Sequence, residues 1–138
     1  KYNLMVNSGA SANELTMLAL NYIHGEGEII VPPLTWISDI SSVIFSGFKP
    51  VFCDINLKNL SFDIDELKKV ITPQTRAIFL THVLGINGLT DELIQLCKDN
   101  NILVDNIFSE ISSGINLDRN EFNNLMNDVF NHKIKNGI

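Results

Sequence analysis

Short apolar runs alternate with helical patterns along most of this 138-residue chain, and this alternation limits its fold more than any other feature. The apolar runs, which predict strands, lie at residues 28–31, 50–53, 77–80 and 102–104. The patterns that predict helices lie at residues 11–24, 35–45, 64–70 and 90–99. Such alternation predicts an α/β fold with a largely parallel sheet, and wholly apolar strands predict helices on both faces, a three-layer α/β/α arrangement.

Parallel sheets of this kind bind their ligands beyond the carboxyl ends of the strands. That rule would bring together the loop at residues 32–36, His82 and Asp105. The helix start near Ser11 belongs to the same rim if residues 4–6 are the tail of an earlier strand.

A Gly/Ala/Ser turn opens onto the first predicted helix. Ser11 and Glu14 have the S-x-x-E spacing of a capping box, which predicts that the helix begins at Ser11. Backbone N–H groups at a helix start lack partners and favour anions, and small residues such as Gly9 and Ala10 let a phosphate come close. The alternative is an ordinary helix cap with no ligand.

Two further residues suggest what the phosphate belongs to. Trp36, the single tryptophan, follows Pro32-Pro33 and could stack on a planar heterocycle, or it could be a core aromatic. Asp105 follows an apolar run and could pair with a protonated ring nitrogen, or it could cap a turn. A phosphate, a flat ring and a ring nitrogen together describe pyridoxal 5'-phosphate (PLP).

Composition excludes several classes of partner. The net charge of -6, without any basic run, argues against a nucleic-acid surface. No apolar stretch approaches the ~20 residues that span a bilayer, so we expect no membrane segment. Cys53 and Cys97 lack metal-site spacing and predict buried free thiols, which fits a reducing cytoplasm. We expect no metal site, and we interpret His82 as a hydrogen-bonded structural residue.

The character of the sequence changes beyond Gly114. Residues 116–136 are rich in Asn and have no strand pattern, but an apolar stripe predicts a terminal amphipathic helix. We therefore expect a partial cofactor-binding domain at residues 1–115 and a divergent helical tail at residues 116–138.

Five segments, in order and in register, resemble the DegT/DnrJ/StrS family of PLP-dependent sugar aminotransferases. They are residues 7–12 (NSGASA), 27–36 (GEIIVPPLTW), 47–54 (GFKPVFCD), 71–78 (ITPQTRAI) and 81–85 (THVLG). The family counterparts of the second, third and fourth segments are GDEVIVP…T[FW], GAKPVFVDID and ITPRTKAI. The sequence from His82 to Gly88 also resembles members close to the sugar 3-dehydrases, in which His replaces the catalytic Lys.

The resemblance spans about Asn7 to Val104 and implies the N-terminal part of a fold-type-I large domain. By this resemblance, residues around Gly9, Ala10 and Ser11 bind the cofactor phosphate, Trp36 stacks on the ring and Asp105 holds the ring nitrogen. It also implies transfer of an amino group, from an amino-acid donor such as glutamate, to a nucleotide-linked keto sugar. Family members of this kind act as homodimers.

Departures from the family pattern define the alternatives. The sequence after Val104 has one residue fewer than the family pattern. If the alignment shifts by one residue, Asn106 rather than Asp105 would lie at the cofactor. The family's Schiff-base Lys lies in a Ser-rich segment that these 138 residues lack, and we assign no catalytic residue. We therefore expect a fragment that is not a competent transaminase alone. The alternatives are a fragment of a PLP-dependent sugar dehydrase and a non-catalytic truncated remnant.

Overall fold

The computed structural model describes residues 4–104 and 120–130, and the chain forms two compact units. One unit is Val6–Leu103, and the other combines Lys1–Met5 with Val104–Ile138. The second unit contains helix α5 (Asn120–Phe130), which confirms the predicted terminal helix. The domain boundary expected at residue 115 lies outside the described residues.

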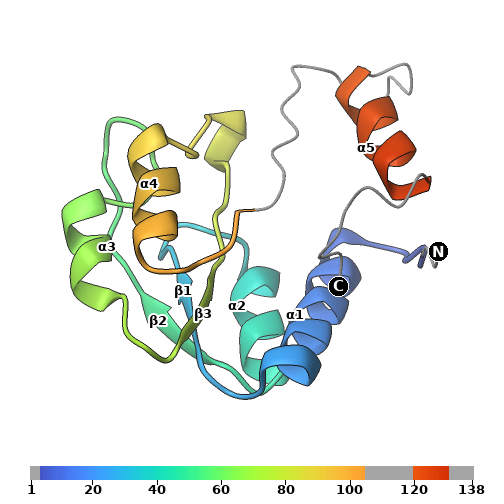
Figure 1. The fold of residues 1–138 in the computed structure, drawn as a ribbon, viewed down its shortest axis with the longest axis horizontal. Coiled ribbons are helices and arrows are strands. Elements are labelled where there is room, and N and C mark those ends of the chain that lie inside the picture. Colours follow the sequence, from blue (N-terminus) through green and yellow to red (C-terminus); the bar gives the residue numbers. More distant parts are fainter. Residues whose placement is uncertain (1–3, 105–119, 131–138) are drawn as a thin grey trace. The chain divides into compact units, whose positions relative to one another are not determined.

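The larger unit is built on a parallel sheet (Figure 1). Its strands are β1 (Glu28–Val31), β2 (Lys49–Phe52) and β3 (Thr75–Ile78). The spatial order is β2-β1-β3, so that β1 is central, and Ile30 of β1 pairs with Val51 on one side and Ile78 on the other. The chain therefore runs from the centre to one edge and then crosses to the opposite edge.

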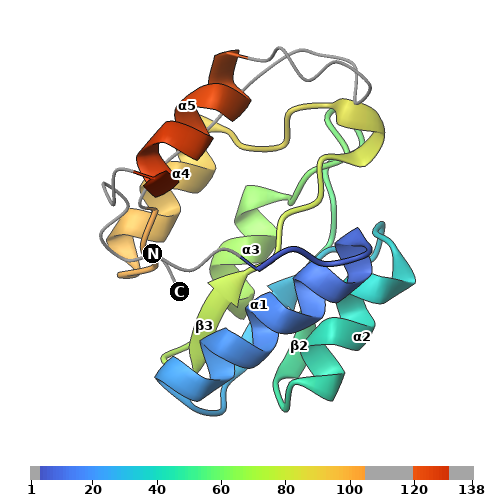
Figure 2. The same ribbon diagram turned by 90° about the vertical axis from the view of Figure 1, so that its right-hand side faces the viewer.

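Helices cover both faces of this sheet. They are α1 (Gly9–His24), α2 (Ile37–Phe45), α3 (Ile64–Val70) and α4 (Asp91–Asp99), with a short 3-10 helix, η1, at Val83–Gly85. Figures 1 and 2 show α1 and α2 side by side on one face and α3 and α4 on the other. The predicted three-layer α/β/α arrangement is confirmed for this unit.

The central strand supplies the core because all four of its residues are buried. Side chains alternate across a strand, so Ile29 and Val31 share one face, where they cluster with Met17 of α1 and Val43 of α2. Burying an aliphatic side chain of this size contributes about 1.5–3 kcal/mol. The core thus holds α1 and α2 against β1, which fixes the helix ends at the sheet rim.

Side-chain caps set the starts of two helices. Asp63 caps α3 by accepting from the N–H groups of Asp65 and Glu66, and the helix spans residues 64–70 as predicted. Thr90 caps α4 by accepting from the N–H of Leu93, so that this helix begins one residue later than predicted. A capping residue lies outside the helix it caps, which explains that difference.

The fourth predicted strand, at residues 102–104, is wrong. The Ile102 N–H donates to the Cys97 carbonyl at 2.8 Å, and Asn101 adopts a left-handed φ of 58°. The chain here completes the C-terminal end of α4, so that this donor is not free for a sheet ladder. The other strands are confirmed, with β2 beginning one residue earlier than predicted and β3 two residues earlier.

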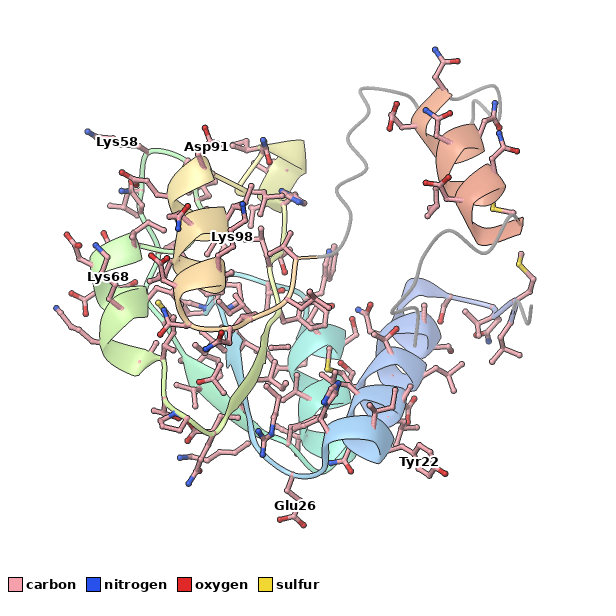
Figure 3. The ribbon with its side chains drawn as sticks, viewed as in Figure 1. Tyr22, Glu26, Lys58, Lys68, Asp91 and Lys98 are labelled. Carbon is pink, nitrogen blue, oxygen red and sulfur yellow. The ribbon has the colours of Figure 1, made fainter. Side chains whose placement is uncertain are left out.

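The outer surface of α1 and α2 carries large apolar side chains. Figure 3 shows Tyr22 projecting outward from α1, and Ile44 and Phe45 of α2 are also exposed. In the described ranges, no helix is both long enough and apolar enough to cross a bilayer. The two cysteines, Cys53 and Cys97, are buried free thiols as predicted.

Candidate functional site

The strand order predicts a ligand position between two particular loops. In a sheet ordered β2-β1-β3 the chain leaves β1 and β3 toward opposite sides, and ligands bind where such a reversal occurs. Trp36 lies on the connection after β1, and Thr81 and His82 follow β3. The rim predicted from the sequence is therefore formed by the loops after β1 and β3.

Helix α1 begins earlier than the sequence pattern predicts, and the capping box of Ser11 and Glu14 is wrong. The N-cap is Ser8, whose extended backbone directs its Oγ to accept from the Ser11 N–H at 3.2 Å. Ser11 therefore lies inside the first turn, where its hydroxyl donates to Asn7 Oδ1 at 2.8 Å. A Ser three residues before the predicted cap competes for the same role, and local spacing alone does not separate the two.

The first turn of α1 has the properties of an anion site. The N–H groups of Gly9 and Ala10 are the first two of the helix and have no intrahelical acceptor. Both residues are exposed, and a Cβ built on Gly9 would meet no atom within 4 Å. The hydroxyls of Ser8 and Ser11 lie 3.1 Å apart beside them. An anion therefore has open access to these donors, and the cap made by Ser8 does not block it.

Trp36 is exposed at the start of α2. It is the N-cap residue of α2, makes no side-chain capping bond and is 77% exposed. The alternative interpretation as a core aromatic is therefore wrong. An indole on a rigid helix start offers a flat face to a planar ring.

A buried carboxyl group at the same rim was not found by sequence reasoning. Asp39 of α2 is only 6% exposed and accepts from Asn13 Nδ2 of α1 at 2.8 Å and from Thr35 Oγ1 at 2.5 Å. Thr35 Oγ1 in turn lies 2.6 Å from Thr81 Oγ1, beyond the end of β3. We call these four residues, Asn13, Thr35, Asp39 and Thr81, the Asp39 network.

The Asp39 network ties together the parts of the rim that were predicted separately. Asn13 lies one turn into the helix whose start is the anion site, and Thr35 directly precedes Trp36. A carboxyl residue within the otherwise apolar and Ser-rich run of α2 was the available signal. Its partners lie 26 and 42 residues away in the chain, which local periodicity cannot reveal.

His82 has the structural role that the sequence suggested. The Gly88 N–H donates to its Nδ1 at 3.0 Å, and the Gly88 carbonyl accepts from Ser61 Oγ at 2.7 Å. A Cβ on Gly88 would lie 2.7 Å from that same Oγ. His82 therefore fixes the loop after β3 rather than binding a ligand through Nδ1.

Other predicted features are either outside the described residues or away from this rim. Asp105 and its alternative Asn106 lie outside the described residues. Within the described part of the chain, no group of acidic, His or Cys side chains could hold a metal ion. Figure 3 shows Lys58, Lys68 and Lys98 on the side of the sheet that carries α3 and α4, away from the start of α1. An anion at α1 would therefore depend on backbone N–H groups and hydroxyls rather than on these lysines.

Comparison with known proteins gives a consistent match over this region. The model of the DegT/DnrJ/EryC1/StrS aminotransferase family matches residues 1–106. GDP-4-keto-6-deoxy-D-mannose 3-dehydratase from Yersinia pseudotuberculosis is 36% identical over 110 residues, which is 75% of this chain and 28% of that protein. GDP-perosamine synthase from Caulobacter vibrioides is 33% identical over 104 residues, again 75% of this chain and 28% of that protein.

Solved structures agree. The Escherichia coli GDP-4-keto-6-deoxy-D-mannose-3-dehydratase with bound hydrated PLP superposes with a TM-score of 0.67 at 32% identity, covering 84% of this chain and 32% of that one. A sugar aminotransferase from Micromonospora echinospora gives a TM-score of 0.64 at 26% identity, covering 70% of this chain and 26% of that one. The chain spans about a quarter to a third of the length of these relatives.

Proposed function

The chain belongs to the DegT/DnrJ/EryC1/StrS aminotransferase family, and from that membership we propose that it forms the cofactor-binding part of a PLP-dependent enzyme acting on nucleotide-linked keto sugars. The observation that carries the proposal is one rim with both an open helix start at Gly9 and an exposed indole at Trp36. A phosphate-bearing planar ring matches both features.

The residues of the first turn of α1 fit the phosphate of PLP. The N–H groups of Gly9 and Ala10 would donate to its oxygens, with the positive end of the helix dipole behind them. The hydroxyls of Ser8 and Ser11 stand beside these donors and could turn toward the same oxygens. Because Gly9 has no side chain, the phosphate can approach the backbone closely.

The ring would lie against Trp36. When bound, PLP supplies an electron sink for negative charge that develops next to its ring. Trp36 would hold the ring flat and exclude water from one of its faces. We keep Asp105 as the proposed partner of the ring nitrogen, where a carboxylate would keep that nitrogen protonated.

The reaction that we propose for a protein containing this segment is transfer of an amino group from an amino-acid donor to the keto sugar. A homodimer and a cytoplasmic location belong to the same proposal, and the buried free thiols of Cys53 and Cys97 fit a reducing compartment. The 138 residues have no Ser-rich segment that carries a Lys. We therefore expect this chain alone to bind the cofactor without completing transamination.

A second candidate is the 3-dehydratase reaction. The observation in its favour is the 36% identity to a 3-dehydratase, which exceeds the 33% identity to the synthase described above. The two activities would share the same phosphate and ring contacts. A non-catalytic remnant is the third reading, and the absence of any PLP binding would favour it.

Binding of PLP tests the proposal directly. Added PLP should quench the fluorescence of Trp36 in a saturable way, because the ring stacks on the single indole. By equilibrium dialysis, Trp36→Ala should weaken binding by roughly 1–3 kcal/mol. Trp36→Phe, which keeps an aromatic face, is the matched control and should lose less. A folded chain that shows no saturable quenching would contradict the proposed site.

A further inference from the structure

With Asp39 ionised, the Asp39 network has only one arrangement of hydroxyl hydrogens that satisfies its short contacts. Thr35 and Thr81 have one hydroxyl hydrogen each. The 2.5 Å contact from Thr35 Oγ1 to Asp39 Oδ2 needs a hydrogen, and Thr35 is its only source because a carboxylate only accepts. The 2.6 Å contact between the two Thr oxygens then takes the hydrogen of Thr81.

The opposite direction of donation would place two acceptor oxygens close together with no hydrogen between them. If Thr81 donated instead to Asp39 Oδ2, at 3.3 Å, Thr35 would donate to Thr81. Thr35 Oγ1 and Asp39 Oδ2 would then lie 2.5 Å apart with no hydrogen between them, which is repulsive. The hydrogen bonds therefore run in one direction, from Thr81 to Thr35 to Asp39.

This direction makes the Thr81 hydroxyl oxygen a hydrogen-bond acceptor at the rim. Its hydrogen is used within the network, and its oxygen keeps acceptor capacity that nothing else in the described ranges fills. Thr81 is partly exposed, whereas Asp39 is buried. The network therefore extends the influence of a buried carboxylate to a surface oxygen that accepts a hydrogen bond.

Asp39 also differs from most buried carboxylates in having no cation. Its partners are the amide of Asn13 and hydroxyl groups, and among the described residues no Lys, Arg or His forms an ion pair with it. Buried charges are normally paired. A carboxylate without a cationic partner at the predicted ligand position therefore suggests that the ligand carries the positive charge.

We propose that Asp39 is a positioning residue that orients Thr81 to accept a hydrogen bond from a protonated nitrogen of the bound ligand. The inference rests on the proposed function, because the ligand is expected to be a PLP form. Two nitrogens have this chemistry: the ammonium group that the cofactor carries in its amino form, and the ring N–H, which Thr81 would bind in place of the proposed partner Asp105.

Asp39→Asn tests the orientation rather than the packing. The variant keeps the shape, but its amide NH₂ would donate to Thr35 Oγ1, so that Thr35 donates to Thr81 and Thr81 donates outward. In this arrangement Asn13 Nδ2 continues to donate to Oδ1 of residue 39. The number of hydrogen bonds is conserved while Thr81 changes from an acceptor to a donor, and we expect a folded protein with a thermal midpoint close to that of the wild type.

Two ligands distinguish which nitrogen donates to Thr81. PLP has the ring nitrogen alone, whereas pyridoxamine 5'-phosphate has the ring nitrogen and an amino group. If the ring N–H is the donor, Asp39→Asn should weaken both probes about tenfold or more. If the ammonium is the donor, the variant should weaken only pyridoxamine 5'-phosphate. Dissociation constants are measured by quenching of Trp36 fluorescence.

Variants of Thr81 provide an independent test in case Asp39→Asn does not fold. Thr81→Val removes the acceptor and should reproduce the selectivity of Asp39→Asn, while Thr81→Ser keeps the hydroxyl and should restore binding. Thr16→Val is the matched control, because its hydroxyl bonds to the Ala12 carbonyl on an exposed turn of α1, outside the Asp39 network.

The outcomes separate this inference from the proposed function. A wild-type chain that binds both probes, with Thr81→Val and Asp39→Asn equally unaffected, would overturn the role of Asp39 and leave PLP binding intact. Uniform weakening by Thr16→Val as well would point to a general structural effect and also overturn it. A wild-type chain that binds neither probe would overturn both proposals together.

Discussion

Two buried carboxyl groups lie at opposite ends of the central strand, and they are held in different ways. Glu28, at the amino end of β1, contacts Lys49 Nζ at 2.9 Å and accepts from Thr72 Oγ1 at 2.7 Å. Asp39, which follows the carboxyl end of the same strand, is held by neutral donors alone. One end of the sheet therefore carries an ion pair, whereas at the other end no Lys, Arg or His of the described residues pairs with the carboxyl group.

This difference separates an ion-paired carboxylate from one held by neutral groups. Glu28 joins the starts of β1 and β2 and the turn before β3, and the Thr72 hydrogen bond and the Lys49 ammonium lower the pKa of Glu28 from its ordinary value. The Lys49 ammonium balances the charge of this carboxylate. At the carboxyl ends of the strands, the hydrogen-bond partners of the Asp39 carboxyl group among the described residues are neutral.

Removing the carboxyl group of Asp39 should have the largest effect on stability. Asp39→Ala leaves the buried amide of Asn13 and the Thr35 hydroxyl without an acceptor, and the free energy of unfolding should fall by about 2–4 kcal/mol. Urea denaturation followed by circular dichroism measures the change. Asp39→Asn is the control, and an equal loss in both variants would show that charge rather than hydrogen bonding holds this end.

Acid should lower the stability that Glu28 contributes at the amino end of β1. Because the pKa of Glu28 is lower in the folded protein than in the unfolded chain, the unfolded chain takes up the proton first as the pH falls. The contribution of Glu28 is therefore complete above its unfolded pKa and disappears as the pH falls through the folded pKa. Denaturation at pH values from 7 down to about 3 should show a steeper decline for the wild type than for Glu28→Gln. Parallel curves would show that Glu28 is not the group responsible.

The smallest effect should come from Lys49. Its side chain is 72% exposed, so its ion pair with Glu28 is screened by water, and Lys49→Ala should cost only about 0.5 kcal/mol. The loss should shrink further in 1 M NaCl, whereas the loss in Asp39→Ala should not depend on salt. A large, salt-independent loss at Lys49 would remove the contrast between the two ends.

The sequence predicted the fold well wherever local chemistry decides it. Strand β1 and helix α3 have the predicted bounds, because a run of buried aliphatic residues and an Asp63 cap are visible in a few neighbouring letters. The strand at residues 102–104 failed because the Ile102 N–H completes the end of α4 and Leu103 is 68% exposed. A short apolar run therefore does not by itself establish either burial or strand pairing.

The candidate site was predicted only in part, for a physical reason. Gly9 and Trp36 could be predicted because a helix start and an aromatic loop residue are recognisable from neighbouring residues alone. The capping residue was misplaced by three residues, since Ser8 and Ser11 are both good caps. Asp39 was missed because its importance comes from Asn13 and Thr81, which only the folded chain brings to it.

Gly88 has a consequence for how this protein can evolve. Its N–H and carbonyl are both engaged, by His82 and by Ser61, and the space where a side chain would begin is already filled. A larger residue at position 88 is therefore excluded unless Ser61 is replaced by a smaller residue in the same lineage. By contrast, Leu84 at the tip of the same loop is exposed, so neighbouring atoms do not limit its side chain, and only its left-handed φ of 54° disfavours β-branched residues there. Lineages of this protein should thus differ at the loop tip while its base stays unchanged.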